Sequence, residues 1–184
     1  MLLYGQGTLL QATLNGALSK SDHPAVPVTV EELAEDAVSC VAARAKSFHL
    51  HPRDEAGKER LDAATVDRVV AAVRGRHGQP VGVSTGAWIE PEAGRRVALV
   101  SRWTQPDFAT VNLSEDGSLG VMRALLQAGS ASKLACGQSP TLSFWRAAGW
   151  PTACCEFASN RSRSAAPMRL TWSARSTPCS IEAM

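Results

Sequence analysis

Hydrophobic residues along the first part of the chain follow two alternating periods, one typical of strands and one typical of helices. Short apolar runs with polar residues at their ends predict strands. The predicted strands are residues 8–15, 47–54, 80–88 and 108–115. Between them, Val66, Val69, Val70 and Val73 lie at i, i+3, i+4 and i+7, which predicts a helix. The chain is therefore expected to begin with four successive βα units and a parallel sheet.

Capping residues mark where the predicted helices begin and end. Thr29 followed by Glu32 forms a capping box, which predicts a helix start, and Asp62 is suited to cap the next helix. Gly78 is suited to end that helix, because glycine readily adopts the left-handed conformation of a C-terminal cap. The remaining two predicted helices are residues 91–103 and 119–129.

Four βα units begin both a doubly wound sheet and a (β/α)8 barrel. The sequence has neither a GxGxxG turn after the first predicted strand nor a Walker A loop, so nucleotide binding by a doubly wound sheet has little support. Polar residues close each predicted strand instead. They are Asn15, His49 with His51, Ser84 with Thr85, and Thr110 with Asn112. This pattern favours a barrel, whose active site lies at the carboxyl ends of the strands.

His49 and His51 are the strongest candidates for chemistry. At i and i+2 on a strand both imidazoles lie on one face, while Phe48 and Leu50 lie on the other. Two adjacent imidazoles are two of the three protein ligands that a catalytic zinc site needs. The alternative is that one histidine is a core residue and the other a surface residue, without a metal.

The other strand-end residues have two interpretations each. Ser84 and Thr85 could cap the next helix, or they could bind a carboxylate or phosphate through hydroxyl and backbone N–H groups. Thr110 and Asn112 face inward together, where they either fill a layer of the barrel or line a site beside the histidines. Arg53 is a candidate anion-binding guanidinium.

Five segments, in order and at βα spacing, carry a resemblance to a known family. They are QATLNGA (11–17), HPAVPVTVEEL (23–33), HLHPRD (49–54), VSTGAW (83–88) and FATVNLSE (108–115). Together they resemble the β-keto acid cleavage enzymes, whose founding activity is 3-keto-5-aminohexanoate cleavage. The resemblance extends from residue 8 to residue 130.

The resemblance implies a zinc-dependent (β/α)8 barrel that condenses a β-keto acid with acetyl-CoA and releases acetoacetate and a new acyl-CoA. It also implies that His49 and His51 are zinc ligands and that Ser84 binds the substrate carboxylate. The predicted substrate-binding residues are Ser84, Thr85, Thr110, Asn112, Asn15 and Arg53. The implied partners are a small-molecule β-keto acid and a CoA thioester, and such enzymes are expected to be homo-oligomeric.

The chain departs from the family pattern in two places. The founding enzyme has a Glu that meets the amino group of its substrate, and this sequence has Leu18 there, so a neutral or apolar substituent is expected. The third zinc ligand of the family is a Glu in a G-[FL]-E-D motif, which this chain lacks. We therefore expect zinc to bind this chain weakly.

Composition changes near the end of the segment that carries this resemblance. Val is absent after Val121 and Asp after Asp116, and residues 133–157 follow neither hydrophobic period. The codons of this region can also be translated in another reading frame, starting at Ser132 and Lys133, if third codon bases are mostly G or C. One permitted translation begins E-A-G-V-W and predicts a strand, a helix and a strand.

This result indicates a frameshift. The alternative is a genuinely divergent C-terminus. Residues 1–130 are then half of a barrel domain, and residues 131–184 an irregular tail that leaves the sheet edges unpaired.

Charge and cysteine content narrow the setting of the protein. A formal net charge of +2 with 20% charged residues gives no reason to expect nucleic acid or a membrane surface as partner. Five cysteines without a CxxC motif argue against a disulfide framework and favour a reducing cytoplasm. No signal peptide or membrane-spanning run is recognised. We expect a cytoplasmic, inactive enzyme fragment, the alternative being a small metal-binding α/β module without activity.

Overall fold

The computed structural model describes residues 10–129, 131–135 and 180–183, which form one six-stranded sheet and four helices. The strands are β1 (Leu10–Thr13), β2 (Ser47–Leu50), β3 (Val81–Ser84), β4 (Phe108–Asn112), β5 (Ala131–Ala135) and β6 (Ser180–Ala183). The helices are α1 (Val30–Ala42), α2 (Ala63–His77), α3 (Ala93–Val100) and α4 (Ser118–Gln127). Strands and helices alternate from β1 to α4, as the hydrophobic pattern predicts.

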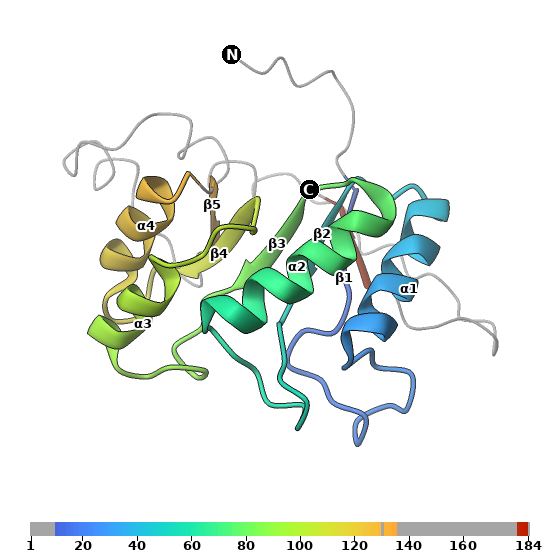
Figure 1. Ribbon diagram of the computed structural model, residues 1–184, viewed down its shortest axis with the longest axis horizontal. Coiled ribbons are helices and arrows are strands. Elements are labelled where there is room, and N and C mark those ends of the chain that lie inside the picture. The colour runs from blue at the N-terminus through green and yellow to red at the C-terminus, as the bar shows by residue number, and fades with distance from the viewer. Residues whose placement is uncertain (1–9, 130, 136–179, 184) are drawn as a thin grey trace, which may run out of the picture.

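The first five strands lie side by side in chain order, because the sheet has the order β5-β4-β3-β2-β1-β6. Neighbouring strands from β1 to β5 are parallel, and β6 is antiparallel to β1. Figure 1 shows the four helices together over one face of the sheet. A doubly wound sheet reverses its strand order and carries helices on both faces, whereas a barrel keeps its helices on the outside. The described residues are therefore α/β with the topology of the first half of a (β/α)8 barrel, and the predicted fold class is confirmed.

The helix boundaries follow the capping residues. At the start of α1 the Thr29 hydroxyl accepts from the Glu32 N–H at 3.2 Å, and the Glu32 carboxylate accepts from the Thr29 N–H at 3.0 Å. Asp62 caps α2 by accepting from the Thr65 N–H at 2.9 Å, and Gly78 ends that helix at a φ of +70°. These caps fix the direction in which each helix leaves its loop.

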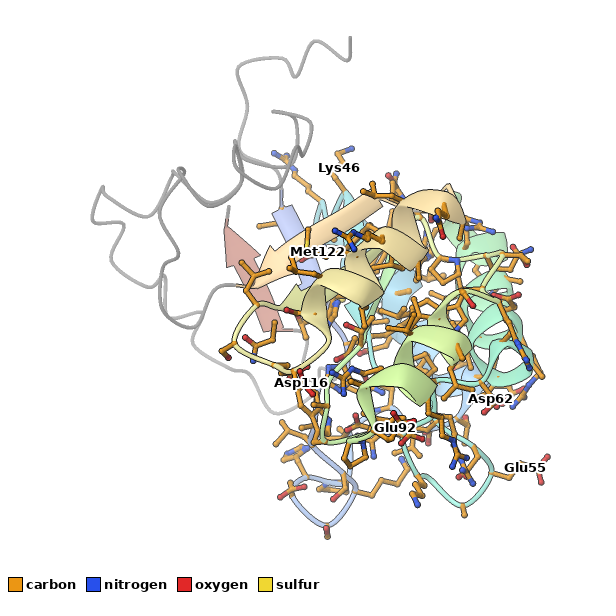
Figure 2. All side chains as sticks on the ribbon, turned by 90° about the vertical axis from the view of Figure 1, so that its left-hand side faces the viewer. Lys46, Glu55, Asp62, Glu92, Asp116 and Met122 are labelled. Atoms are coloured by element: carbon orange, nitrogen blue, oxygen red, sulfur yellow. The ribbon has the colours of Figure 1, made fainter. Side chains whose placement is uncertain are left out.

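The core lies between the helices and one face of the sheet. It contains Phe48, Leu50, Val81, Val83, Ala109 and Val111 from the strands and the four valines Val66, Val69, Val70 and Val73 from α2. Figure 2 shows the two ends of this layer, with Asp62 and Glu92, which cap α2 and α3, near one end and Lys46 at the other. The helix-capping end is the carboxyl edge of the strands, where barrel enzymes place their active sites.

The opposite face of the sheet carries a different set of side chains. Across the strands Thr13 is paired with His49, His49 with Gly82, and Ser84 with Thr110. Residues paired in a parallel sheet share a face, so these polar groups all lie away from the helices. Gly82 leaves room for the Phe108 ring, since a Cβ there would lie 2.0 Å from that ring. This polar face corresponds to the inside of a barrel.

Two strands lie where the sequence predicted an irregular tail. Residues 131–135 pair in parallel with β4, and residues 180–183 pair with β1. The prediction of a four-stranded sheet with unpaired edges at β1 and β4 is therefore wrong. A sheet edge offers free backbone N–H and C=O groups, which pair with an extended segment whatever its side-chain period. The remaining prediction for the tail falls on residues 136–179, outside the described residues.

Two observations bear on the setting of the protein. Cys40 in α1 is disulfide-bonded. In the part of the chain that the structure describes, no helix is long and apolar enough to cross a membrane.

Candidate functional site

The two histidines lie side by side at the carboxyl end of β2. His49 is in the strand and His51 follows it directly, with ring centroids 5.4 Å apart and ring planes at 87°. Phe48 and Leu50, which alternate with them, are fully buried in the core. Both imidazoles therefore lie on the inner face of the sheet, as their spacing predicts.

Asn15 fixes the backbone of His51. Its side-chain N–H donates to the His51 carbonyl at 3.0 Å, and its Oδ1 accepts from the His51 N–H at 2.9 Å. Asn15 lies just beyond β1 and is buried, so these two bonds join the ends of β1 and β2 away from water. The Asn15 side-chain amide is thus hydrogen-bonded to the His51 backbone, and the binding of substrate by Asn15 stays a prediction.

Glu59, which the sequence analysis did not single out, holds the ring of His51. Its Oε2 lies 3.1 Å from His51 Nδ1 and accepts from Trp88 Nε1 at 2.9 Å. Burial alone would raise the pKa of the Glu59 carboxyl, but hydrogen bonds from His51 and Trp88 outweigh it and hold that pKa below its usual value. Glu59 therefore carries a negative charge beside His51.

Glu59 lies in the irregular segment between β2 and α2, where no hydrophobic period marks it. The signal that could have found it is an acidic residue in the same βα loop as the paired histidines. Carboxylates commonly orient metal-binding histidines through the second ring nitrogen.

Arg53 clamps the loops around the histidines. Its guanidinium donates to the carbonyls of Gly57, Gly16 and Leu18 at 3.0, 3.1 and 2.6 Å. It also lies 3.7 Å from the Glu59 carboxylate. Because Arg53 is 7% exposed and faces these carbonyls, the structure gives it a loop-binding role, and its binding of an anion stays a prediction.

Thr110 is the strand-end residue of β4 that reaches the histidines. Its hydroxyl lies 3.4 Å from His49 Nδ1. The Thr85 hydroxyl donates to the Thr110 backbone carbonyl at 2.8 Å and is buried. The ends of β3 and β4 are thereby joined beside the histidine pair.

Ser84 and Asn112 contact their own turns. The Ser84 hydroxyl oxygen accepts from the Gly86 N–H at 3.3 Å, and the side-chain Oδ1 of Asn112 accepts from the Ser114 hydroxyl at 2.9 Å. Glu92, not Ser84 or Thr85, caps α3, so the alternative interpretation of these two residues as a helix cap is wrong. The Ser84 oxygen is an acceptor here, so its O–H can still donate to a ligand.

The residues present fit two thirds of a catalytic zinc site. Both imidazoles meet a polar partner through Nδ1, which is Glu59 for His51 and Thr110 for His49. Such contacts fix ring orientation and direct Nε2 toward a metal. A catalytic zinc takes three protein ligands, and within the described ranges no group of three His, Cys, Asp or Glu could hold a metal.

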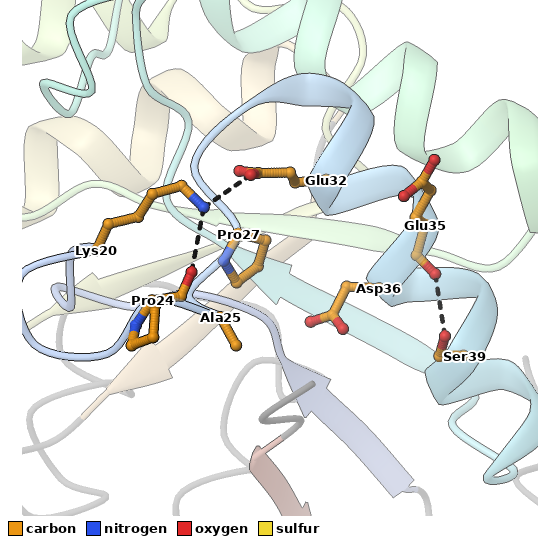
Figure 3. A pocket seen from close by; sticks show the side chains of 8 residues that line it. All are labelled: Lys20, Pro24, Ala25, Pro27, Glu32, Glu35, Asp36 and Ser39. Carbon is orange, nitrogen blue, oxygen red and sulfur yellow. Dashed lines mark hydrogen bonds and ion pairs between the residues drawn. The ribbon is translucent and has the colours of Figure 1, made fainter. Parts of the chain in front are cut away.

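A pocket of about 280 Å³ lies elsewhere, between the β1–α1 loop and α1. Figure 3 shows Lys20 crossing it, with its ammonium 2.7 Å from the Glu32 carboxylate and 3.4 Å from the Pro24 carbonyl. None of its lining residues is a predicted site residue. The candidate site is therefore not this pocket but the group of side chains around His49 and His51 at the carboxyl ends of the strands.

The family model for beta-keto acid cleavage enzymes matches residues 8–129. The match covers all four βα units, including the paired histidines and the loops that hold them. The chain belongs to the beta-keto acid cleavage enzyme family, and the resemblance seen in the sequence is confirmed.

Individual relatives match over shorter stretches. A 3-keto-5-aminohexanoate cleavage enzyme of Fusobacterium nucleatum subsp. nucleatum is 37% identical over 67 residues, which are 36% of this chain and 25% of that enzyme. The apo structure of ObcA matches with a TM-score of 0.48 and 16% identity, over 60% of this chain and 30% of that chain. The chain thus spans about a quarter of the curated relative's length.

Proposed function

We propose that this chain carries the first half of the active site of a zinc-dependent enzyme that exchanges acyl groups between a β-keto acid and acetyl-CoA. The products are acetoacetate and a new acyl-CoA. The observation that carries the proposal is the pair His49 and His51, held side by side on the inner face of the sheet in a member of this family.

The residues divide into those that hold the metal and those that hold the substrate. His49 and His51 supply two of the ligands, and a zinc ion held there would act as a Lewis acid toward the substrate oxygens. Ser84 donates its hydroxyl proton to the substrate carboxylate, and Thr85, Thr110, Asn112, Asn15 and Arg53 shape the surrounding wall. Leu18, which is 54% exposed, meets the substrate substituent and favours a neutral or apolar one.

We propose further that the 184-residue chain alone is inactive. It lacks the G-[FL]-E-D motif that supplies the third zinc ligand, and the described ranges offer no replacement. The absence of Val after Val121 and of Asp after Asp116 supports a frameshift near residue 130. The cytoplasmic location and the homo-oligomeric state belong to the same proposal.

The test compares this chain with a frame-corrected protein. Nucleotide sequence across codons 125 to 140, read in all frames, gives the corrected sequence. Both proteins are then assayed for acetoacetate from a β-keto acid and acetyl-CoA with zinc present. We expect acetoacetate from the corrected protein only.

Variants assign that activity to the histidine pair. His49→Ala in the corrected protein removes a ligand and should abolish acetoacetate release. His77→Asn is the matched control, because His77 lies at the end of α2, at the opposite edge of the sheet, and it should keep the activity. Turnover by the 184-residue chain, or by the His49→Ala variant, would contradict the proposal.

A further inference from the structure

Glu59 lies at the centre of contacts that converge on His51. One carboxylate oxygen is 3.1 Å from His51 Nδ1 and 2.9 Å from Trp88 Nε1, and the other is 3.7 Å from the Arg53 guanidinium. The side chains of His51 and Glu59 are 9% and 14% exposed. An isolated antiparallel bridge between Arg53 and Glu59 also fixes the Glu59 backbone. The carboxylate is therefore held from several sides.

The contact determines which ring nitrogen of His51 carries the proton. An ionised carboxylate has acceptors only, so a hydrogen bond at this distance requires the proton on Nδ1 of His51. The neutral ring then has its lone pair on Nε2, the nitrogen suited to bind a metal. Asn15 fixes the backbone of the same residue through two hydrogen bonds, so both the position and the protonation of this ring are set.

Trp88 covers the His51–Glu59 pair. Its ring stacks on that of His51 with centroids 6.0 Å apart and planes at 27°, while its N–H binds Glu59. The ring also lies against Gly86, where a Cβ would come within 2.4 Å of three ring atoms. A side chain at position 86 would therefore displace the indole, so Gly86 is part of the arrangement.

We propose that Glu59 is a positioning residue that selects the Nδ1–H form of His51, and that Trp88, seated on Gly86, holds Glu59 in place. The protonation pattern stands on the contacts alone. Its purpose, presenting Nε2 to a metal, rests on the proposed function.

The first measurement is the protonation of the histidine rings in the metal-free, 184-residue chain. ¹⁵N NMR of histidine-labelled protein at about pH 8, above the usual histidine pKa, distinguishes the Nδ1–H from the Nε2–H form. We expect His51 in the Nδ1–H form. A wild-type His51 in the Nε2–H form would overturn the proposal without any variant, even if Glu59 variants failed to fold.

Glu59→Gln tests the cause. The amide keeps the size of the side chain but can donate to Nδ1, so the Nε2–H form of His51 should appear. Glu55→Gln is the matched control, because Glu55 is an exposed acidic residue of the same loop whose side chain projects outward from the ribbon (Figure 2), and it should leave the His51 signals unchanged. Gly86→Ala should shift them in the same direction as Glu59→Gln. Unchanged His51 signals in Glu59→Gln would contradict the role of the carboxylate.

Zinc titration, followed at the same histidine signals, tests the link to metal binding. Loss of a carboxylate partner typically weakens metal affinity tenfold or more, so Glu59→Gln should bind zinc at least about tenfold more weakly than wild type, and Glu55→Gln should not. Equal affinity of Glu59→Gln and wild type would overturn the positioning role. Failure of the proposed enzymatic activity is a separate result, because it would leave the ring protonation of His51 unchanged.

Discussion

The carboxyl edge of the sheet has two halves that use similar polar residues in different ways. At the ends of β1 and β2, side chains bind residues from other loops, as Asn15 does with His51 and Arg53 does with Leu18. At the ends of β3 and β4, Ser84 and Asn112 bind the turn that directly follows them. In the second half the links between loops come from other side chains, such as Glu115, which accepts from the Ala87 N–H at 2.9 Å.

The two halves therefore differ in what their side chains do: those of the first half hold a ligand-binding group in position, and those of the second half are available to bind a ligand themselves. In the first half, hydrogen bonds fix the backbone and ring of His51, which suits a residue that must keep one orientation. In the second half, the Ser84 hydroxyl accepts from the Gly86 N–H and keeps its proton to donate. Contacts between the halves run from Thr110 to His49 and from Trp88 to Glu59.

The largest loss of stability should come from removing the Asn15 side chain, whose hydrogen bonds to His51 join the ends of β1 and β2. Asn15→Ala leaves the buried N–H and carbonyl of His51 without partners, and each such group costs about 1–3 kcal/mol, so we expect a loss of about 3 kcal/mol in the free energy of unfolding. Asn112→Ala, the matched change in the second half, should cost less than about 1 kcal/mol. Urea denaturation of both variants measures the difference, and equal losses would refute the contrast between the halves.

A smaller loss of stability is expected when the hydrogen bonds from the Arg53 guanidinium to the loop carbonyls are weakened. Arg53→Lys keeps the charge but cannot supply the guanidinium fork that reaches three carbonyls, so we expect a loss of about 2 kcal/mol. Arg60→Lys is the control, because Arg60 is exposed and pairs with Asp54 at the surface, and it should change stability by less than about 0.5 kcal/mol. Urea denaturation again provides the measurement. Unchanged stability of the Arg53→Lys variant would show that the hydrogen bonds of the Arg53 guanidinium do not stabilise the loops.

In the second half, the hydrogen bond between β3 and β4 should matter less. Thr85→Val removes the hydroxyl that donates to the Thr110 carbonyl and keeps the shape, so we expect a loss of about 1 kcal/mol. Thr110→Val should cost less, because its contact with His49 is long, but should shift the His49 signals in an NMR spectrum. A Thr85→Val loss as large as that of Asn15→Ala would remove the distinction drawn above.

The smallest effect concerns acid sensitivity near the first half. Burial raises the pKa of Glu32, but hydrogen bonds from Lys20 and from the N–H groups of Val28 and Thr29 outweigh it and lower the pKa to about 2. A lowered folded-state pKa stabilises the fold above the ordinary value of 4.5, and that stability is lost as pH falls toward about 2.

The test compares wild type with Glu32→Gln by thermal unfolding across that pH range. Wild type should be the more stable protein above pH 4.5, and the gap should narrow below it. Because Glu32 is partly exposed, the gap should be small. If the difference in stability between wild type and Glu32→Gln does not change with pH, the charge of Glu32 does not contribute to that difference.

The sequence predicted those parts of the fold that depend on local patterns. The capping box at Thr29 and Glu32 and the buried stripe of α2 are where spacing places them. The pairing of His49 with His51 follows from strand geometry alone. Glu59 could not be predicted in this way, because its contact with His51 depends on the path of an irregular loop. The role of Arg53 was missed for the same reason, since its partners include carbonyls of another loop.

The strands β5 and β6 show a second limit. The expectation of an irregular tail weighed side-chain periodicity, whereas pairing at an open edge is a property of the backbone. Residues 131–135 lie parallel to β4 in the place of a fifth barrel strand. The frameshift hypothesis is neither supported nor weakened by that pairing, because backbone pairing does not depend on the reading of the codons.

The antiparallel strand on β1 has a consequence for reassembly. In a closed (β/α)8 barrel the outer edge of β1 pairs with the last parallel strand, and here that edge is occupied by β6. A separately supplied second half of the barrel would have to displace β6 before its own strand could pair with β1. Complementation of the two halves should therefore show a lag set by strand exchange, and deleting residues 180–183 should shorten it.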